Sequence, residues 1–485
     1  MTCRNSGQVV TTKQHERSEF IISNLRGTVP AVVALTAALL IMFPEASQAV
    51  PSYARQTNIP CLSCHTVFPA LTPFGRSFKL NGYVANAGEV IESKENGTKP
   101  GSEEEVLTLG KVPPISVMLL TSWTSTHKTQ TGAEQNGDLL LPDQFSFFLA
   151  GQIAPKAGAF MQVTYEATTD HFSWDNTDIR AADTVSMGEQ TFLYGVSLNN
   201  NPTVQDVWNS TPAWGYPYAG SPVAPTPAAV TKIDGALAQQ VAGISVYTLW
   251  NNLVYAELGA YHASPVGASR PLSGTCGSAT PPCTAPAEQV VEGAAPYWRL
   301  ALQKQFGEHN VMVGAYGMNT HILPGNPDPL SGATNRFDDI ALDIQYEKSF
   351  GEDFLTVHST WIHESQDWLA GGSTNQKDKL DVFRVDANYN IKHRYAGILG
   401  FFSTTGTSDA GLYGSGGLYG SDSANGSPNS SGMVAELDWL PWLNTKFGLQ
   451  YTAYNKFDGA SSNYDGNGRT AHDNNTTYAY IWLIF

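Results

Sequence analysis

Ile115–Trp123 reads ISVMLLTSW, and its side chains alternate between two faces. The odd positions form an almost continuous apolar row, whereas Ser116 and Ser122 place hydroxyl groups among the even positions. Residues 159–165 and Ile340–Tyr346 show the same period of two. One apolar row and one mixed row are typical of strands in a transmembrane β-barrel, where they face lipid and lumen. A soluble β-sandwich alternates in a similar way, so the connections must distinguish the two folds.

Short and long connections alternate along the chain. Short turns are expected at 154–158, 199–202, 251–252, 307–310, 351–353, 390–394 and 441–444. Long polar stretches lie near 125–142, 168–188, 210–239, 264–293, 321–337, 365–379, 406–430 and 455–474. This spacing predicts about sixteen strands over residues 115–485, of which the fifth is Thr203–Ser210. Short periplasmic turns and long extracellular loops are typical of outer-membrane barrels. We therefore predict an all-β outer-membrane barrel with extracellular loops and periplasmic termini.

Composition and the C-terminus agree with a barrel. Charged residues make up 14 % and aromatic residues 11 % of the chain, and there are 45 glycines. The chain ends on Tyr478–Phe485, YAYIWLIF, which resembles the terminal assembly signal of bacterial barrels; a buried last strand of an ordinary domain is the alternative. A net charge of −16 without a basic tract argues against nucleic-acid binding. We expect outer-membrane lipid to surround the barrel.

Residues 61–65 read CLSCH, the attachment pattern of a c-type haem. Cys61 and Cys64 would each form a thioether with the porphyrin, and His65 would be an axial ligand of the iron. A zinc half-site and a thioredoxin-like redox pair are the alternatives. The pattern occurs once, so one covalently bound haem c is expected for the whole chain.

The N-terminal region predicts export. Basic residues precede an apolar run from Val29 to Phe43, and Ser47 and Ala49 fit a cleavage site, so residues 1–49 are expected to be a signal peptide. A retained membrane anchor is the alternative, but the run is shorter than the ~20 residues that span a bilayer. Residues 50–114 are then the haem domain and its linker, the linker being Glu89–Lys111.

The haem domain is too short to bury much surface by itself. Four apolar residues recur at spacings of three and four and could cover a porphyrin; they are Phe68, Leu71, Phe74 and Phe78. Pro69 and Pro73 limit any helix there to short turns. We therefore expect a plug in or at the mouth of the barrel.

The sixth iron ligand has no obvious source within residues 50–114, which contain no Met and no His besides His65. Met118 is the nearest Met and lies on the lumen-facing row of its strand, so we consider it as a distal ligand, with packing in the lumen as the alternative. A His/Met pair would raise the reduction potential. In the loop near 264–293, Cys276 and Cys283 are expected to form a disulfide, because an exported protein meets an oxidising environment.

Four segments around the haem motif carry a family resemblance. They are residues 53–57 (YARQT), 61–69 (CLSCHTVFP), 71–76 (LTPFGR) and 78–83 (FKLNGY). These segments resemble the outer-membrane cytochrome–porin fusions of iron-oxidising bacteria. The resemblance implies a monohaem plug in a sixteen-stranded barrel, with Cys61, Cys64 and His65 holding the haem. It also implies an iron:cytochrome or iron:copper-protein oxidoreductase that oxidises extracellular Fe(II). Its electrons would pass to a periplasmic blue-copper protein or to c-type cytochromes of the respiratory chain.

Two other functions are compatible with the sequence. The chain could be a diffusion porin or solute transporter in which the haem module is a gate or a sensor. It could also be a soluble periplasmic cytochrome fused to a β-rich binding domain. The chain has 43 acidic and 27 basic residues, and this excess of negative charge could attract Fe(II). At strongly acidic pH most carboxylates are protonated, so this attraction would be weak there, and acidic loops also serve solubility.

Overall fold

The computed structural model describes residues 51–485, apart from residues 67, 86–113, 131–135, 264–289, 325–331 and 443. The expected signal peptide, the linker Glu89–Lys111 and the pair Cys276 and Cys283 lie outside the described residues.

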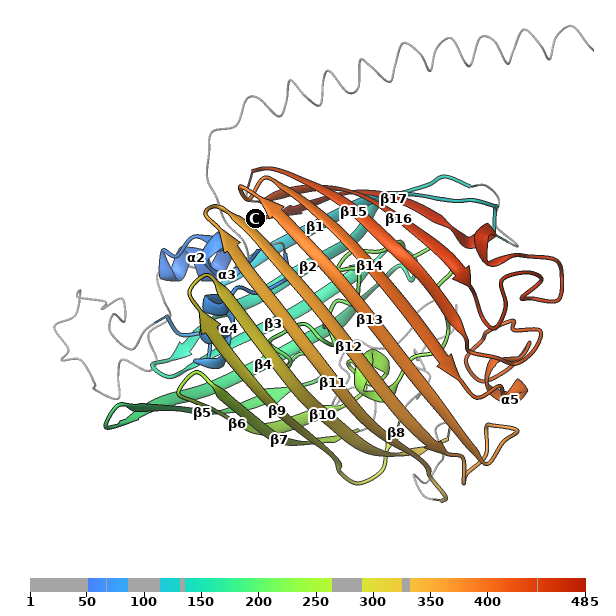
Figure 1. Cartoon of the computed structure of the whole chain (residues 1–485), viewed down its shortest axis with the longest axis horizontal. Helices are drawn as coiled ribbons and strands as arrows, with labels where there is room; N and C mark the ends of the chain where they lie inside the picture. Colours follow the sequence, from blue (N-terminus) through green and yellow to red (C-terminus); the bar gives the residue numbers. More distant parts are fainter. Residues whose placement is uncertain are drawn as a thin grey trace, which may run out of the picture. The chain divides into compact units, whose positions relative to one another are not determined.

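The described strands form one antiparallel sheet that closes into a barrel, because β1 pairs with both β2 and β17 (Figure 1). The strands are β1 (Ile115–Thr126), β2 (Asp138–Ala154), β3 (Ala157–Glu166), β4 (His171–Met187), β5 (Gln190–Asn199), β6 (Ala242–Trp250), β7 (Val254–His262), β8 (Val290–Val291), β9 (Ala295–Phe306), β10 (His309–Leu323), β11 (Asn335–Phe350), β12 (Asp353–Asp367), β13 (Lys377–Ile391), β14 (Tyr395–Gly406), β15 (Ser430–Trp442), β16 (Thr445–Lys456) and β17 (Thr476–Ile484). The two-residue β8 only extends the pairing of β10, which leaves sixteen long strands. The predicted sixteen-stranded barrel is confirmed.

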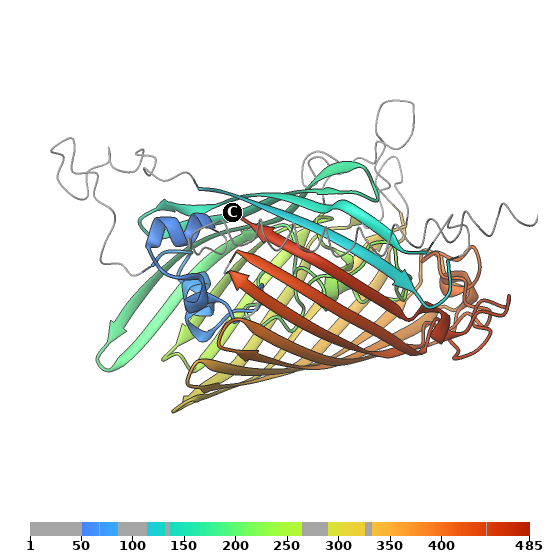
Figure 2. The same ribbon diagram turned by 90° about the horizontal axis from the view of Figure 1, so that it is seen from above.

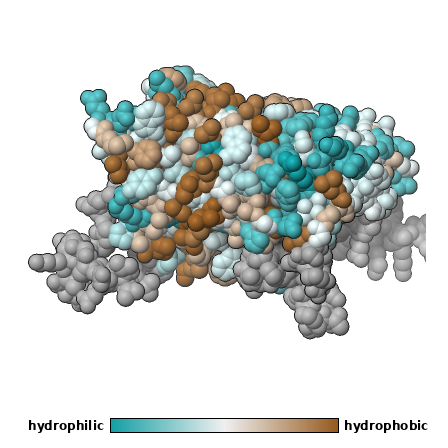
Figure 3. All heavy atoms as spheres, turned by 90° about the horizontal axis from the view of Figure 1, so that it is seen from below, coloured by the Kyte–Doolittle hydropathy of each residue, from teal (hydrophilic) through white to brown (hydrophobic). Residues whose placement is uncertain are grey.

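The two faces of the wall differ as the alternation predicts. Ile340, Leu342 and Ile344 are 46–52 % exposed on the outside, whereas Asp343 and Gln345 between them are buried on the inside. Exposed aromatic residues lie at the ends of strands on the short-turn side, for example Trp250, Phe306, Phe350 and Tyr395. Figure 3 shows hydrophobic side chains across the middle of one face and hydrophilic ones toward the loop end. An apolar belt with aromatic residues near its border is the surface of a membrane-spanning barrel.

Two connections differ from the sequence prediction. Residues 168–188, predicted as a long loop, contain β4, and the turn at Gly188 joins it to β5. The register of β3 and β4 shifts between Met161 and Val163, and this bulge places both Asp175 and Asn176 inside and breaks the period of two. The predicted turn at 199–202 and the predicted strand Thr203–Ser210 are wrong as well. Both belong to a long connection between β5 and β6.

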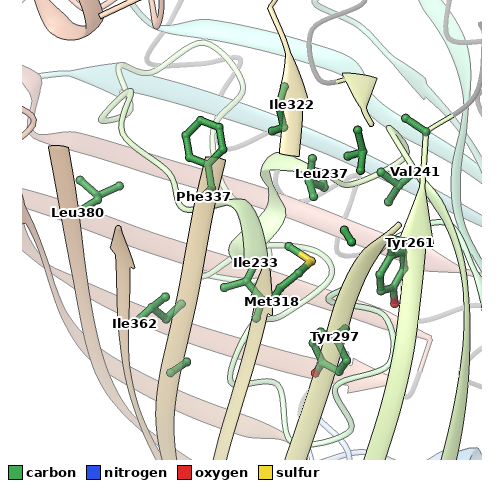
Figure 4. Close-up of a cluster of buried hydrophobic side chains, with 14 of the residues drawn as sticks. Ile233, Leu237, Val241, Tyr261, Tyr297, Met318, Ile322, Phe337, Ile362 and Leu380 are labelled. Carbon is green, nitrogen blue, oxygen red and sulfur yellow. The ribbon is translucent and has the colours of Figure 1, made fainter. Parts of the chain in front are cut away.

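This connection, residues 200–241, folds into the barrel, and we call it the inward loop. Its one helical element is the short, irregular η2 (Lys232–Ala236). Its side chains from Asn200 to Trp208 are buried without alternation, because protein surrounds them on all sides. Ile233 and Leu237 pack among lumen-facing side chains of β7 to β13, including Tyr261, Phe337 and Ile362 (Figure 4). The inward loop therefore builds a hydrophobic core inside the barrel.

The N-terminal residues 51–85, which we call the plug, contain three short helices: α2 (Pro51–Thr57), α3 (Cys61–Cys64) and α4 (Pro73–Leu80). They lie at the end of the barrel where the C-terminus lies, opposite α5 (Ala410–Tyr413) and η3 (Ala471–Asn474) of the long loops (Figures 1 and 2). Within the described residues, no helix is long and apolar enough to cross a membrane.

Candidate functional site

The CLSCH motif forms a single turn of helix. Pro60 precedes α3 in an extended conformation, and the His65 amide donates to the Cys61 carbonyl at 2.9 Å. After His65 the chain reverses, and the Thr66 amide donates to the Ala70 carbonyl at 3.1 Å. The turn brings the two sulfur-bearing residues and the imidazole into one small region.

Helix α4 holds this turn in place. Its N-cap is Thr72, whose hydroxyl accepts from the Gly75 amide at 3.0 Å, and whose own amide donates to the Cys64 carbonyl at 2.9 Å. A Cβ atom on Gly75 would lie 2.2 Å from the Cys64 carbonyl oxygen, so only glycine allows this packing. Pro73 occupies the first position of α4, so it marks where this eight-residue helix begins.

Backbone and side-chain groups of the plug bond to several strands of the barrel wall. Arg76 forms two parallel bonds of 2.8 and 2.5 Å with Glu347 of β11, and both side chains are buried. Further bonds to the wall are those of Ser52 to Ser116, Tyr53 to Ala159, Thr66 to Asn390, Leu80 to Tyr247, and Tyr83 to Asp178. The predicted plug is therefore a fixed part of the barrel interior.

A cavity of about 990 Å³, counted to its open mouth, lies between the plug and the inward loop. The plug contributes the motif residues Cys61, Cys64 and His65 to its wall, together with apolar residues such as Leu71 and Phe78. The opposite wall consists of Phe160, Asn176, Thr203, Val204, Asp206, Asn209, Ala213 and Trp214.

The motif residues have the properties that a covalently attached haem requires. Cys61 and Cys64 are not joined by a disulfide, and both face the cavity. Burial raises the pKa of Cys64 to about 11, with a smaller contribution from Cys61, whereas a thioredoxin-like thiol has a lowered pKa. Burial lowers the pKa of His65 to about 4, although the carbonyl groups of Pro69 and Ala70 oppose this shift. The imidazole is therefore neutral above that pH, the form that binds a metal, and its buried Nδ1 lacks a hydrogen bond.

The predicted apolar cover forms only in part. Leu71 and Phe78 line the cavity, but Phe74 is 45 % exposed, and Phe68 packs on the His65 ring outside the cavity wall. The spacing of three and four requires one continuous helix, and Pro69 and Pro73 interrupt it. The barrel supplies the missing cover through Phe160 and Trp214, whose rings lie 5.9 Å apart.

Met118 lies in the lumen, as predicted, with 3 % exposure. It packs with Tyr83, Phe148 and Phe160 and is not among the residues that line the cavity. Its role as a distal ligand stays a prediction. The sequence prediction did not assign Lys79 or Asn176 to the cavity wall. Lys79 lies in the segment 78–83 quoted above, but nothing in that segment marks it as a wall residue, and no motif marks Asn176, which lies at a strand bulge.

The inward loop is fastened to the wall by buried ion pairs. Arg299 of β9 binds Asp343 of β11 and lies 3.5 Å from Asp206 of the loop. Its guanidinium is stacked between the rings of Trp208 and Tyr316, at 4.8 and 4.7 Å from their centroids. Because the lumen-facing Arg299 is completely buried, protein rather than water surrounds it at this level of the barrel.

Comparisons with known proteins concern the barrel alone. No protein-family model and no curated protein matches the chain. Similar solved structures include OmpT of Vibrio cholerae, an outer membrane protein (9 % identity, TM-score 0.40, 76 % of this chain and 96 % of that chain). An anion-selective porin from Comamonas acidovorans is also similar (12 %, 0.42, 76 % and 98 %), as is the outer membrane channel DcaP of Acinetobacter baumannii (10 %, 0.43, 76 % and 96 %). With TM-scores below 0.5, the function has to be inferred from the chain's own residues.

Proposed function

We propose that this protein is an outer-membrane electron conduit, in which a single haem c is attached to Cys61 and Cys64 and its iron is bound by His65. The observation that carries the proposal is the position of all three motif residues on one cavity that the plug and the barrel build together. The barrel itself would reside in the outer membrane, since its outer face is an apolar belt bordered by aromatic residues.

The proposed reaction is the transfer of one electron from extracellular Fe(II) through the protein to a periplasmic acceptor. Fe(II) becomes Fe(III), and the acceptor, a blue-copper protein or a c-type cytochrome, is reduced by one electron. The bound haem would supply the redox centre that accepts the electron and passes it on. Such a transfer requires neither a general base nor a nucleophile. The identity of the substrate and of the acceptor follows from the family resemblance of the plug.

The protein's own residues would hold and insulate the redox centre. His65 supplies a neutral nitrogen, and Leu71, Phe78 and Trp214 present apolar surface that excludes water from the cavity. The Arg76–Glu347 pair and the Tyr83–Asp178 bond fix the plug relative to the wall. Since the plug lies at the short-turn end, the site would be close to the periplasm if these turns are periplasmic.

Mixing the purified, detergent-solubilised protein with Fe(II) at acidic pH tests the proposal. We expect the absorption bands of reduced haem c to appear, and we expect haem staining to persist on a denaturing gel because the attachment is covalent. A Cys61→Ala/Cys64→Ala variant should lose all covalent haem. Ser63→Ala, which keeps the C-x-x-C-H pattern, should retain it.

Two outcomes would contradict the proposal at different levels. Absence of covalent haem in the wild-type protein would reject the assignment of Cys61, Cys64 and His65. Covalent haem that Fe(II) does not reduce would reject Fe(II) as the donor but would retain the haem site.

A second candidate is a diffusion porin in which the haem module gates the channel. The observation that favours it is the barrel size, since barrels of 16–18 strands commonly enclose an aqueous channel. Liposome swelling in sugars of graded size distinguishes the two functions. The conduit predicts little permeation, because the plug and the inward loop occupy the lumen; a porin predicts permeation that depends on the redox state of the haem.

A further inference from the structure

Two of the polar residues on the cavity wall carry N–H donors that the CLSCH motif does not account for. They are Lys79 of α4, the one lysine or arginine among the residues that line the cavity, and Asn176 of β4. Asn176 is buried and the Lys79 side chain is 15 % exposed, and neither takes part in the proposed attachment of the haem.

The hydrogen bonds around Asn176 determine the orientation of its amide. Asn201 accepts from the Thr203 amide at 3.0 Å, so its side-chain oxygen is identified and its Nδ2 must donate. This Nδ2 donates to Oδ1 of Asn176 at 2.8 Å, and Nε2 of Gln239 donates to the same oxygen at 3.1 Å. Nδ2 of Asn176 is then left buried without an acceptor. A buried donor without a partner destabilises the folded protein, so an acceptor from a bound group is the natural explanation.

Lys79 is a partly buried cation whose ion-pair partner Asp178 also binds a second cation. Its Nζ donates to the Val204 carbonyl and lies 3.9 Å from Asp178, but Asp178 also binds Arg180 at 2.7 Å. Burial lowers the pKa of Lys79 to about 8, and Arg180 adds to this effect, although Asp178, Asp206 and Glu257 oppose it. Among the described residues, only Asp178 is within ion-pair distance of Lys79. A further anion in the cavity would therefore stabilise the ammonium group.

The two donors lie near each other on the cavity wall because both residues bond to one short segment of the inward loop. Lys79 binds the carbonyl of Val204, and Asn176 binds Asn201, only three residues earlier in the inward loop. The Val204 amide donates to the Asn201 carbonyl at 3.0 Å, which closes this short segment. The inward loop thus assembles a pair of donors from a plug helix and a barrel strand.

We infer that Lys79 and Asn176 bind the carboxylate groups of the porphyrin that is attached to the CLSCH motif. This inference rests on the proposed function. A haem c carries two propionate carboxylates, and its remaining periphery is apolar apart from the attachment points. Carboxylates that enter a buried cavity need charged or N–H donors, and charge-assisted hydrogen bonds are the strongest available. In this arrangement the plug attaches the haem and the barrel receives its charged edge.

Resonance Raman spectra of the haem-loaded, full-length protein test the inference, because the propionate bending bands respond to hydrogen bonding. Asn176→Asp keeps the shape of the side chain and its Oδ1 acceptor, but it replaces the N–H donor with a carboxylate oxygen, which has the same charge as a propionate. Lys79→Met removes the cation, and Lys79→Arg restores one. Thr57→Val is the matched control, since Thr57 lines the same cavity but its hydroxyl already donates to the Tyr53 carbonyl at 2.8 Å.

We expect the propionate bands to shift in Asn176→Asp and in Lys79→Met, to return toward the wild-type position in Lys79→Arg, and to stay unchanged in Thr57→Val. Unchanged bands in both test variants with haem attached would overturn the inference, as would an equal shift in Thr57→Val. If one test variant leaves the bands unchanged, that residue is excluded from the site. Failure of the wild-type protein to bind haem at all would instead reject the proposed function.

Discussion

The plug and the inward loop both occupy the lumen, but different interactions hold them. Bonds from individual side chains, such as the Arg76–Glu347 pair, connect the plug to strands around the barrel, and the plug carries its chemistry in the five residues from Cys61 to His65. The inward loop packs a continuous hydrophobic core and adds the Asp206–Arg299–Asp343 cluster. The difference shows that individual polar bonds hold one lumen segment, whereas hydrophobic packing together with a buried ion cluster holds the other.

Removing the central cation of the inward loop should have the largest effect. In Arg299→Met, Asp206 and Asp343 remain buried without their partner, which costs about 4–5 kcal/mol of unfolding free energy and releases the loop from the wall. Limited proteolysis should then cleave within residues 200–241. Lys304→Met is the matched control, because Lys304 lies on the same strand near Phe306 and outside this cluster. If both variants resist proteolysis equally well, packing alone holds the inward loop.

Breaking the ion pair between Arg76 of the plug and Glu347 of β11 should have a somewhat smaller effect on the unfolding free energy. Arg76→Met leaves Glu347 buried and unpaired, at a cost of about 3–4 kcal/mol in urea unfolding. The double variant Arg76→Met/Glu347→Leu removes both charges, so its unfolding free energy should recover to within about 2 kcal/mol of the wild type. If the double variant is as unstable as the sum of its single variants, the pair does not act as a unit.

The segment around α5 packs against the inward loop, and we predict that the stability of this contact depends on pH. Asp409 is the N-cap of α5 and accepts bonds from Ser373, Thr374 and Asn375, and Tyr419 of the same loop contacts Lys232. Burial raises the pKa of Asp409, but the bonds from these donors outweigh it and lower the pKa to about 2. Because the folded pKa is below the ordinary value of about 3.8, this stabilisation is complete above pH 4 and is lost as the pH falls toward 2.

Asp409→Ala should cost about 1–2 kcal/mol at neutral pH and should remove this acid-dependent step. Hydrogen exchange of residues 229–237, measured from pH 5 to pH 2 with correction for the intrinsic rate, reports how well the segment around α5 protects the inward loop. A step of the same size in the variant would show that another group controls it.

The smallest effect is expected for Met118→Leu. The two side chains have similar volumes, so the stability change should stay below about 1.5 kcal/mol. Since Met118 packs beside Tyr83 and Phe148 rather than on the cavity wall, we expect an unchanged haem spectrum. Loss of a low-spin spectrum would instead identify Met118 as the sixth ligand.

Much of the wall could be predicted from the sequence, because local alternation reports directly on which face of a strand is buried. β1, β3 and β11 follow this rule, and the short turns at 307–310 and 351–353 lie where they were expected. β4 was missed because its bulge breaks the alternation and its polar residues resemble a loop. Thr203–Ser210 was taken for a strand because burial on all sides leaves no periodic signal at all.

The barrel and the CLSCH pattern, which predicts haem attachment, can both be recognised in the sequence, because each involves residues that are close together in the chain. The inward turn of residues 200–241 is visible only in the folded molecule, as is the cavity that Lys79, Asn176 and Trp214 line together with His65. Those neighbours are distant in sequence, and closure of the β-sheet brings them together around the plug. No local pattern records such a contact, because its energy arises from surfaces that meet only after folding.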